Sequence, residues 1–120
     1  MTPAPIEIPI GRASELVRDG ARVVPLPPLP WDMHREAVVV IDDEGRAHAY
    51  LNRCKHLPVP LDGGTRDFFD STRRYLLCGT HGALYERNSG FCIAGPCRGK
   101  ELTRLDLIER DGELRIVIAE

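Results

Sequence analysis

Two short segments, each with one cysteine and one histidine, constrain this chain more than any other feature of its sequence. One residue separates the cysteine from the histidine in CKH, and two residues separate them in CGTH. Each pair follows a strand-like segment and precedes stiff or small residues. Two hairpin tips could therefore bring two thiolates and two imidazoles together as metal ligands. The four candidate ligands are Cys54, His56, Cys78 and His81.

Two cysteines and two histidines are compatible with either one zinc ion or a two-iron cluster. Tetrahedral zinc accepts this ligand set. However, zinc sites usually leave two to four residues between paired ligands, and only Lys55 lies between Cys54 and His56. Two ligands separated by one residue do not match the spacing that is usual for a single tetrahedral ion. They are natural across two irons, where one iron takes both thiolates and the other takes both imidazoles.

The composition is that of an ordinary globular domain. The chain has 120 residues, of which 42% are hydrophobic and 28% are charged, and this length suffices for one core without cross-links. We therefore expect a single domain over residues 1–120. A net charge of −2 argues against a nucleic-acid partner. No apolar run is long enough to span a membrane, so no membrane association is expected.

The N-terminal segment and the cysteine content indicate the cellular compartment. MTPAPIEIPIG has neither the basic start nor the apolar stretch of a secretory signal. The expected location is therefore cytoplasmic. In that compartment four cysteines favour metal or redox chemistry over disulfides.

Alternating and β-branched segments predict a mostly β fold. An apolar run at 37–41, the turn residues DDEG, and alternation over 46–51 predict one hairpin. A second hairpin is predicted over 102–118, with a turn at Asp111-Gly112 and one face formed by Leu114, Ile116 and Ile118. A third candidate, FFDSTRRYLLC, turns near residues 70–72.

Two segments depart from the strand pattern. ASELVRD, residues 13–19, predicts a helix of about two turns with Ser14 as its cap. VPLPPLPW, residues 24–31, predicts a stiff extended connector within the fold. The alternative for this proline-rich segment is a ligand for a proline-recognition module.

CKH and CGTHG resemble the two ligand motifs of the Rieske [2Fe–2S] proteins, in particular the small soluble Rieske-type ferredoxins of bacterial oxygenase and reductase systems. THGALYERNSGFCIAGPC is similar to the second motif of that family and its proline-bearing third loop, here Gly95-Pro96. The resemblance covers Tyr50 to the C-terminus and, more loosely, the first strands. It implies an all-β, Rieske-like fold of stacked antiparallel sheets. A small cluster-binding subdomain formed by loops is expected at about residues 52–98.

The resemblance also implies the cofactor and its ligands. One [2Fe–2S] cluster would be held by the thiolates of Cys54 and Cys78 on one iron and the imidazoles of His56 and His81 on the other. In the family the third loop lies against the cluster, which makes Pro96 a candidate neighbour of the cluster.

Comparison with high-potential members of the family implies a low reduction potential. The disulfide that links the two cluster loops in such members cannot form here, because the matching positions hold Val59 and Thr80. Those members also carry a serine and a tyrosine where this chain has Ala83 and Tyr85. Hydrogen bonds to cluster or ligand sulfur raise the potential. One donor is missing and Tyr85 is a candidate for the other, so we expect the lower half of the range of about −150 to +300 mV.

The function implied is electron transfer without catalysis. The resemblance suggests a flavoprotein ferredoxin reductase as electron donor and a terminal oxygenase or reductase as acceptor. A catalytic iron would need two further histidines and a carboxylate, and only His34 and His48 remain. The alternatives are a small subunit of a nitrite-reductase-type complex and a zinc-stabilised binding module.

Cys92 and Cys97 flank the third loop and are left outside the ligand set. They could form a redox pair or bind a second metal. The simpler interpretation is that both are small buried residues that pack beside this loop.

Overall fold

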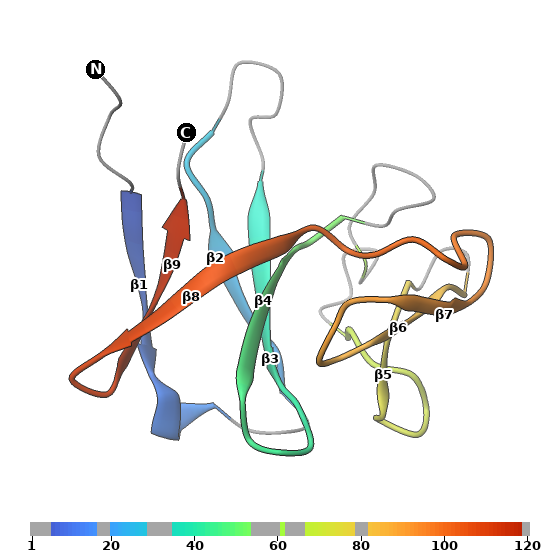
Figure 1. Cartoon of the computed structure of the whole chain (residues 1–120), viewed down its shortest axis with the longest axis horizontal. Coiled ribbons are helices and arrows are strands. Elements are labelled where there is room, and N and C mark those ends of the chain that lie inside the picture. Colours follow the sequence, from blue (N-terminus) through green and yellow to red (C-terminus); the bar gives the residue numbers. More distant parts are fainter. Residues whose placement is uncertain are drawn as a thin grey trace.

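The computed structural model describes residues 6–16, 20–28, 35–53, 61, 67–78 and 82–118. In these residues the chain forms two antiparallel sheets and one short 3-10 helix, η1 (Ala13–Glu15), as Figure 1 shows. The larger sheet has the order β1-β9-β8-β4-β3-β2 and the smaller one the order β5-β6-β7. The prediction of an all-β fold of stacked antiparallel sheets is confirmed. The strands are β1 (Ile6–Arg12), β2 (Arg22–Pro25), β3 (Glu36–Ile41), β4 (Ala47–Leu51), β5 (Tyr75–Leu77), β6 (Leu84–Glu86), β7 (Cys92–Ala94), β8 (Arg104–Arg110) and β9 (Glu113–Ile118).

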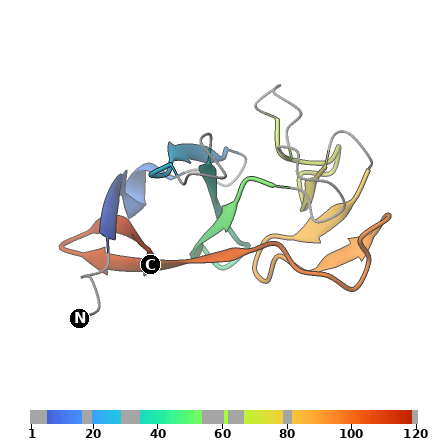
Figure 2. The same ribbon diagram turned by 90° about the horizontal axis from the view of Figure 1, so that it is seen from above.

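Strand β8 joins the two halves of the larger sheet. Its first residues, Arg104 and Leu105, pair with β4, and the stretch from Asp106 to Arg110 pairs with β9. The sheet thereby folds over on itself and encloses a first core, and the two halves are seen from above in Figure 2. The buried residues of this core are Ile10, Val24, Leu26, Ala37, Val39, Ala49, Leu114 and Ile116.

Strand β3 is buried on both faces. Ala37 and Val39 point into the first core, whereas Val38 and Val40 point into a second core. A strand with two buried faces needs apolar residues at consecutive positions. This explains why AVVVI is a continuous apolar run and does not alternate with polar residues.

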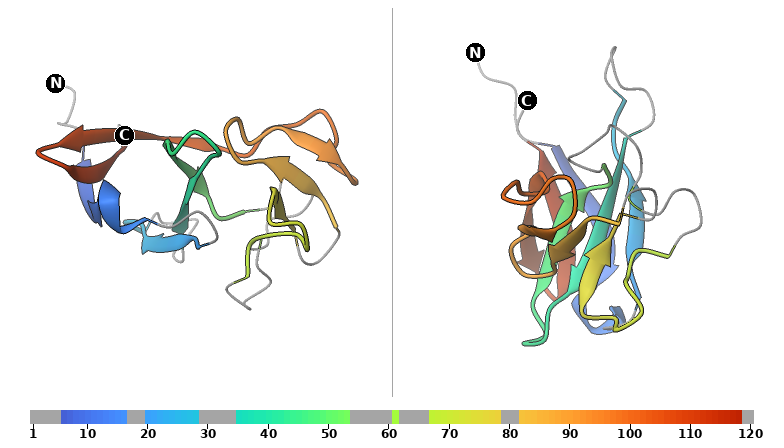
Figure 3. Two further views of the ribbon diagram at one scale, coloured as in Figure 1. Left: turned by 90° about the horizontal axis from the view of Figure 1, so that it is seen from below. Right: turned by 90° about the vertical axis from the view of Figure 1, so that its right-hand side faces the viewer.

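The second core lies between β3–β4 and the small sheet. Figure 3 shows the small sheet at the opposite end of the molecule from β1 and β9. The large sheet contributes Val38, Val40 and Tyr50 to this core. The other side chains come from the small sheet and from the segments that flank its strands. The buried residues are Val38, Val40, Tyr50, Leu61, Phe68, Phe69, Leu76, Cys78, Ala83, Tyr85, Cys92, Cys97 and Leu102.

Polar contacts through Arg87 tie the two layers together. The buried Tyr50 hydroxyl on β4 donates to the Arg87 carbonyl at 2.6 Å. The Arg87 guanidinium donates to the carbonyl of Ile41 at 3.0 Å and to the carbonyl of Arg73, and it lies over the ring of Phe69 at 4.1 Å. Charge-assisted hydrogen bonds of this kind are stronger than neutral ones, so they stabilise the contact between the two layers.

The first predicted hairpin is confirmed as β3 and β4. Its turn is closed by a bond from the Asp42 amide to the Arg46 carbonyl at 2.9 Å. The Asp42 carboxylate accepts the amides of Glu44 and Arg46 and lies 2.8 Å from His48 Nε2. Burial raises the pKa of Asp42, but these hydrogen bonds outweigh it and hold the pKa below the ordinary value.

The second predicted hairpin is also confirmed, as β8 and β9. Asp111 and Gly112 have φ values of 55° and 80°, as a two-residue turn of this twist requires. On the predicted face Leu114 and Ile116 are buried, and Ile118 packs partly buried against the same core.

The third predicted hairpin turns where expected. The Arg73 amide donates to the Asp70 carbonyl at 3.0 Å, and the Asp70 carboxylate accepts from the Thr72 hydroxyl. Across the turn, Phe69 forms an isolated antiparallel bridge with Leu76, which belongs to β5.

The prediction of a two-turn helix over residues 13–19 is wrong. Among residues 13–16 the chain forms η1, and Leu16 is already extended, with ψ of 138°. Residues 17–19 lie outside the described residues. The Ser14 cap is not formed. The Arg12 amide donates to Glu15 Oε1 at 2.8 Å, so the acidic side chain stabilises a tight turn.

The proline-rich segment begins as a strand. Val24 and Pro25 end β2, and the Leu26 amide donates to the Arg35 carbonyl at 3.0 Å. Residues 29–34, which include His34, lie outside the described residues. None of the described segments is a helix long and apolar enough to cross a bilayer.

Tyr50 makes stability sensitive to alkaline pH. Burial raises the pKa of Tyr50 from 10.0 to about 12. The unfolded chain therefore loses this proton at lower pH than the folded chain. The contribution of Tyr50 to the free energy of unfolding is therefore fully present below pH 10. It is lost, by about 3 kcal/mol, as the pH rises from 10 to about 12.

Tyr50→Phe tests this directly. The variant should lose about 1 kcal/mol at neutral pH, because the Arg87 carbonyl loses its donor. Its stability should then fall less steeply above pH 10 than that of the parent. Chemical unfolding at a series of pH values measures both. Equal slopes above pH 10 would mean that Tyr50 does not carry the effect.

Candidate metal centre

The described residues contain one of the four candidate ligands, Cys78. Residues 54–60, which include Cys54, His56 and Val59, lie outside them, as do residues 79–81 with Thr80 and His81. The structure describes the residues that lead into and out of both segments. These flanking residues define how each half of the site is held.

Asn52 closes the segment that carries the first pair. It follows β4 and is 8% exposed, and its backbone N–H donates to the Glu36 carbonyl at 2.8 Å. Its side-chain Oδ1 accepts the amide of Leu61, which is fully buried, at 2.9 Å. The two ends of the segment bearing Cys54 and His56 are therefore fastened to each other and to β3. No sequence motif indicates this role, because it depends on a contact nine residues along the chain.

Cys78 begins a tight loop that carries the second pair. It follows β5 directly and is fully buried. Its amide donates to the Ala83 carbonyl, and the Gly82 amide donates to the Cys78 carbonyl, both at 2.8 Å. Gly82 has φ of 75°, which suits glycine at this return. The loop between these bonds is the one that holds His81.

The Gly95-Pro96 turn packs directly against this second loop. A Cβ on Gly95 would lie 2.7 Å from the Cα of Ala83. The turn is closed by bonds from Arg98 to Gly95 at 3.2 Å and from Lys100 to Cys97 at 3.0 Å. The turn therefore contacts Ala83, which lies two residues after His81 in sequence, and Pro96 is exposed.

One face of the small sheet carries the Tyr85 hydroxyl and the thiols of Cys78 and Cys92. Tyr85 pairs with Leu76 on β5 and with Cys92 on β7. Alternate residues of a strand share a face, so Cys78 lies on the face of Leu76, and Ala83 on that of Tyr85. All of these residues are buried. A sulfur-rich, apolar face thus lies directly beside the candidate ligand.

The sulfur beside the Tyr85 hydroxyl is that of Cys97, at 2.8 Å. This partner was not predicted, and a bond from Tyr85 to a ligand sulfur stays a prediction. Cys97 Sγ also lies 3.4 Å from Cys92 Sγ. Both cysteines are buried, as expected of residues that pack beside the third loop.

The second metal site considered from the sequence is not assembled in the part of the chain that the structure describes. Cys78, Cys92 and Cys97 are not in disulfides. Across the described ranges, no three side chains of His, Cys, Asp or Glu converge as a metal site. His48 is a strand residue bound to Asp42.

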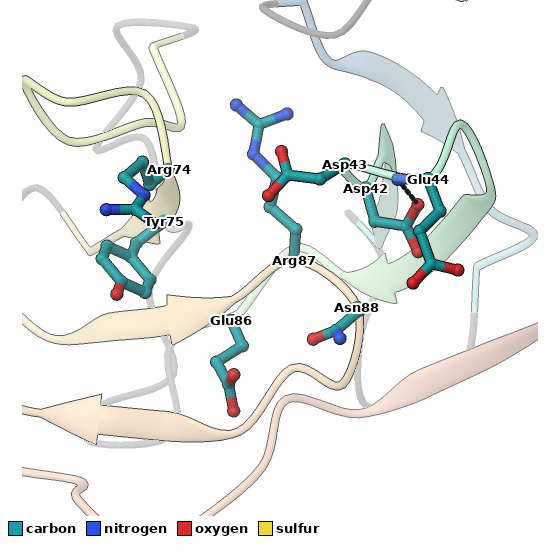
Figure 4. A pocket seen from close by; sticks show the side chains of 8 residues that line it. All are labelled: Asp42, Asp43, Glu44, Arg74, Tyr75, Glu86, Arg87 and Asn88. Carbon is teal, nitrogen blue, oxygen red and sulfur yellow. Dashed lines mark hydrogen bonds between the residues drawn. The ribbon is translucent and has the colours of Figure 1, made fainter.

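A polar pocket lies on another side of the small sheet, about 260 Å³ in volume. Figure 4 shows carboxylates of the β3–β4 turn facing side chains from β5, β6 and the turn after β6. Arg87, in its wall, is the residue that ties the two layers. The lining residues are Asp42, Asp43, Glu44, Arg74, Tyr75, Glu86, Arg87 and Asn88.

A family comparison identifies the domain. The model of the Rieske [2Fe-2S] domain matches residues 8–114 of this chain. The chain belongs to the Rieske [2Fe-2S] domain family. A Rieske domain is an electron-transfer module and implies a [2Fe–2S] cluster. A search of curated proteins gives no match.

Solved structures share the Rieske fold. The terminal oxygenase of carbazole 1,9a-dioxygenase from Novosphingobium sp. KA1 has a TM-score of 0.74 at 18% identity, over 99% of this chain and 31% of that chain. The corresponding oxygenase from Nocardioides aromaticivorans IC177 gives 0.73 at 15% identity, over 99% and 32%. The reduced complex between oxygenase and ferredoxin in carbazole 1,9a-dioxygenase gives 0.71 at 17% identity, over 99% and 30%. The present chain thus spans about a third of the length of these chains.

The described residues fit a cluster of this kind. Cys78 is a thiol in an apolar environment at the start of a closed loop, and the loop that holds Cys54 and His56 is fastened at both ends. Buried, pre-positioned thiolates with apolar surroundings are what such a cluster uses.

Asn52→Ala should loosen the first pair. It leaves the buried Leu61 amide without its acceptor, which costs about 1–3 kcal/mol, and it frees one end of the loop. Unfolding measurements on the metal-free protein and iron content after purification test both effects. Asn88→Ala is the control, because Asn88 is exposed. Equal iron retention in the two variants would contradict the role given to Asn52.

Gly95→Ala should damage the contact between the third loop and the second pair. Gly95 and Gly99 have similar φ values of 97° and 93°, but an added Cβ meets Ala83 only at Gly95 and nothing within 4 Å at Gly99. Both variants carry roughly 1 kcal/mol of backbone strain, and Gly95→Ala adds about 1–3 kcal/mol of overpacking.

Gly99→Ala is therefore the matched control. Gly95→Ala should unfold at lower denaturant concentration and lose iron faster than Gly99→Ala. If the two variants behave alike, backbone strain alone explains the loss, and contact with Ala83 contributes nothing.

Proposed function

We propose that this chain is a Rieske-type ferredoxin, a non-catalytic carrier of single electrons. The observation that carries the proposal is the match to the Rieske [2Fe-2S] domain over residues 8–114, with Cys78 buried on the loop that bears His81. The carrier is a single domain over residues 1–120. Its small sheet and adjoining loops, about residues 52–98, form the cluster-binding subdomain.

The proposed ligands are Cys54 and Cys78 on one iron and His56 and His81 on the other, with Tyr85 and Pro96 as neighbours of the cluster. A cluster bound in this way accepts and releases one electron at a time. Three features support this ligand set: the Asn52 clamp, the loop closed at Cys78, and the third loop packed on Ala83. Each restricts movement of the loops around the ligands, which suits a site that must change little between oxidation states.

The proposed partners are a flavoprotein ferredoxin reductase as donor and a terminal oxygenase or reductase as acceptor. The similarity to an oxygenase–ferredoxin complex supports the class of acceptor. The cytoplasm is the proposed location.

Anaerobic purification with metal analysis and low-temperature EPR tests the proposal. The dithionite-reduced protein should contain about two irons per chain and give a rhombic signal of low average g value. One zinc and no colour would support a zinc-stabilised module instead. A colourless protein without metal calls for cluster reconstitution, and failure to take up iron then rejects the carrier.

Cys78→Ser should remove the signal and most of the iron, because a hydroxyl is a poor substitute for a thiolate ligand. Cys92→Ser is the matched control, since Cys92 is equally buried on the same face but outside the proposed set. It should keep both iron and signal. Loss of iron in both variants would mean that any polar substitution in this core disrupts the site.

A further inference from the structure

Cys92 and Cys97 lie on either side of the Gly95-Pro96 turn, and their sulfur atoms are in contact. Cys92 begins β7, and Cys97 directly follows the turn. The two Sγ atoms are 3.4 Å apart, and neither cysteine is in a disulfide. A disulfide bond is about 2.05 Å long, so the sulfurs would need to approach by about 1.4 Å. Rotation about a Cα–Cβ bond moves a sulfur farther than this.

Backbone hydrogen bonds hold the two cysteines close to each other. The Cys92 N–H donates to the Lys100 carbonyl at 2.7 Å, and the Gly99 N–H donates to the Cys92 carbonyl at 3.2 Å. The Lys100 N–H in turn donates to the Cys97 carbonyl at 3.0 Å. Lys100 is thus bonded to both cysteines through the backbone. The proximity of the two sulfurs is therefore a property of the fold and not of the short sequence separation alone.

Cys97 is a buried residue within an otherwise exposed turn. Its exposure is 1% and that of Cys92 is 0%, whereas residues 95–96 and 98–100 are exposed. A surface turn of this kind opens at a lower free-energy cost than the core does, and its opening brings the Cys97 sulfur to solvent. The exposed residues include an arginine and a lysine, whose positive charges favour the reactive thiolate.

We propose that Cys92 and Cys97 are a reversible dithiol–disulfide pair that reacts with low-molecular-weight disulfides. The Cys97 thiolate attacks one sulfur of such a compound, forms a mixed disulfide and releases the first small thiolate. The Cys92 thiolate then attacks the Cys97 sulfur, forms the intramolecular disulfide and releases the second small thiolate. The protein gives up two electrons and two protons, and the compound takes up both and leaves as two thiols.

The two states of the pair differ in how the Gly95-Pro96 turn is held. In the reduced state the Cys92 thiol donates to the Ala94 carbonyl at 3.1 Å, because a carbonyl oxygen can only accept. Oxidation removes the proton of this bond and links the two ends of the turn covalently. The turn has little room to adjust, since Gly95 lies against Ala83. Oxidation therefore fastens the same turn that packs on the second ligand segment.

Thiol mapping on the unaltered protein tests the inference. Cleavage by trypsin after Arg87 and Arg98 releases residues 88–98, a peptide that contains Cys92 and Cys97 and neither of the other two cysteines. The protein is equilibrated anaerobically with mixtures of reduced and oxidised glutathione, denatured, and treated with N-ethylmaleimide before digestion. As the share of oxidised glutathione rises, the peptide should change from doubly alkylated to unalkylated, with the loss of two hydrogen atoms. Dithiothreitol should restore double alkylation.

The same titration in denaturant separates the fold from sequence proximity. In the folded protein the disulfide should form about tenfold more readily, because a disulfide that suits the native geometry is favoured by the fold. Cys92→Ser and Cys97→Ser are the matched controls. Each leaves one thiol in the peptide, which should then carry either maleimide or glutathione and never appear unmodified.

Three results would each overturn the inference. The peptide could stay doubly alkylated at every glutathione ratio, it could carry glutathione without closing to the internal disulfide, or it could titrate equally in folded and denatured protein. Iron analysis of the same preparation tests the proposed function separately. Protein that takes up no iron but oxidises this peptide as expected rejects the electron carrier and supports the dithiol pair, so the two failures are distinguishable.

Discussion

Burial of β3 on both faces is the constraint on which the rest of the structure depends. Val38, Val39 and Val40 are each at most 1% exposed, and they alternate between two separate cores. Burying such a side chain contributes about 1.5–3 kcal/mol. Because β3 pairs with β2 and β4, both neighbours take their register from it. The first ligand segment leaves the sheet at the end of β4, so its position is also set by β3.

Arg87 gives the contact between the layers its specificity. An apolar interface alone would allow the small sheet to shift on β3 and β4, since hydrophobic contacts are not directional. The guanidinium must reach the Ile41 carbonyl and the Phe69 ring together, and its own carbonyl must meet the Tyr50 hydroxyl. These requirements fix the position of the small sheet, and with it the loop that starts at Cys78.

Local turn chemistry made the hairpins predictable from the sequence, whereas contacts between distant segments remained hidden. DDEG identifies its turn because the Asp42 carboxylate accepts the amide of Glu44 within the turn. Asp111-Gly112 identifies its turn because both residues tolerate the positive φ values that it requires. The segment ASELVRD was misjudged because its local pattern suits a helix, but the chain becomes extended at Leu16. Short strands such as β6 and β7 carry too few residues for a periodic pattern to appear.

The same division applies to the candidate site. The paired motifs and the third loop predicted the family, because ligand spacing is a local property of the sequence. The contacts of Asn52 and Cys97 could not be found in this way. They depend on which amide or hydroxyl the fold brings to each residue, Leu61 in one case and Tyr85 in the other.

The bond between Asn52 and Leu61 also bears on how such a chain can diverge. Leu61 is fixed before the segment that leads to β5, and the second pair is positioned by β5 itself. Phe68 is buried in the same core as Leu61, so the connection between Leu61 and Phe68 joins two anchored points. Longer loops between fixed ends add little closure entropy, about 0.6 kcal/mol for each doubling of length. Insertions and deletions in this connection can accumulate while the two ligand pairs keep their relation to each other, so the spacing between the motifs can drift without loss of the site.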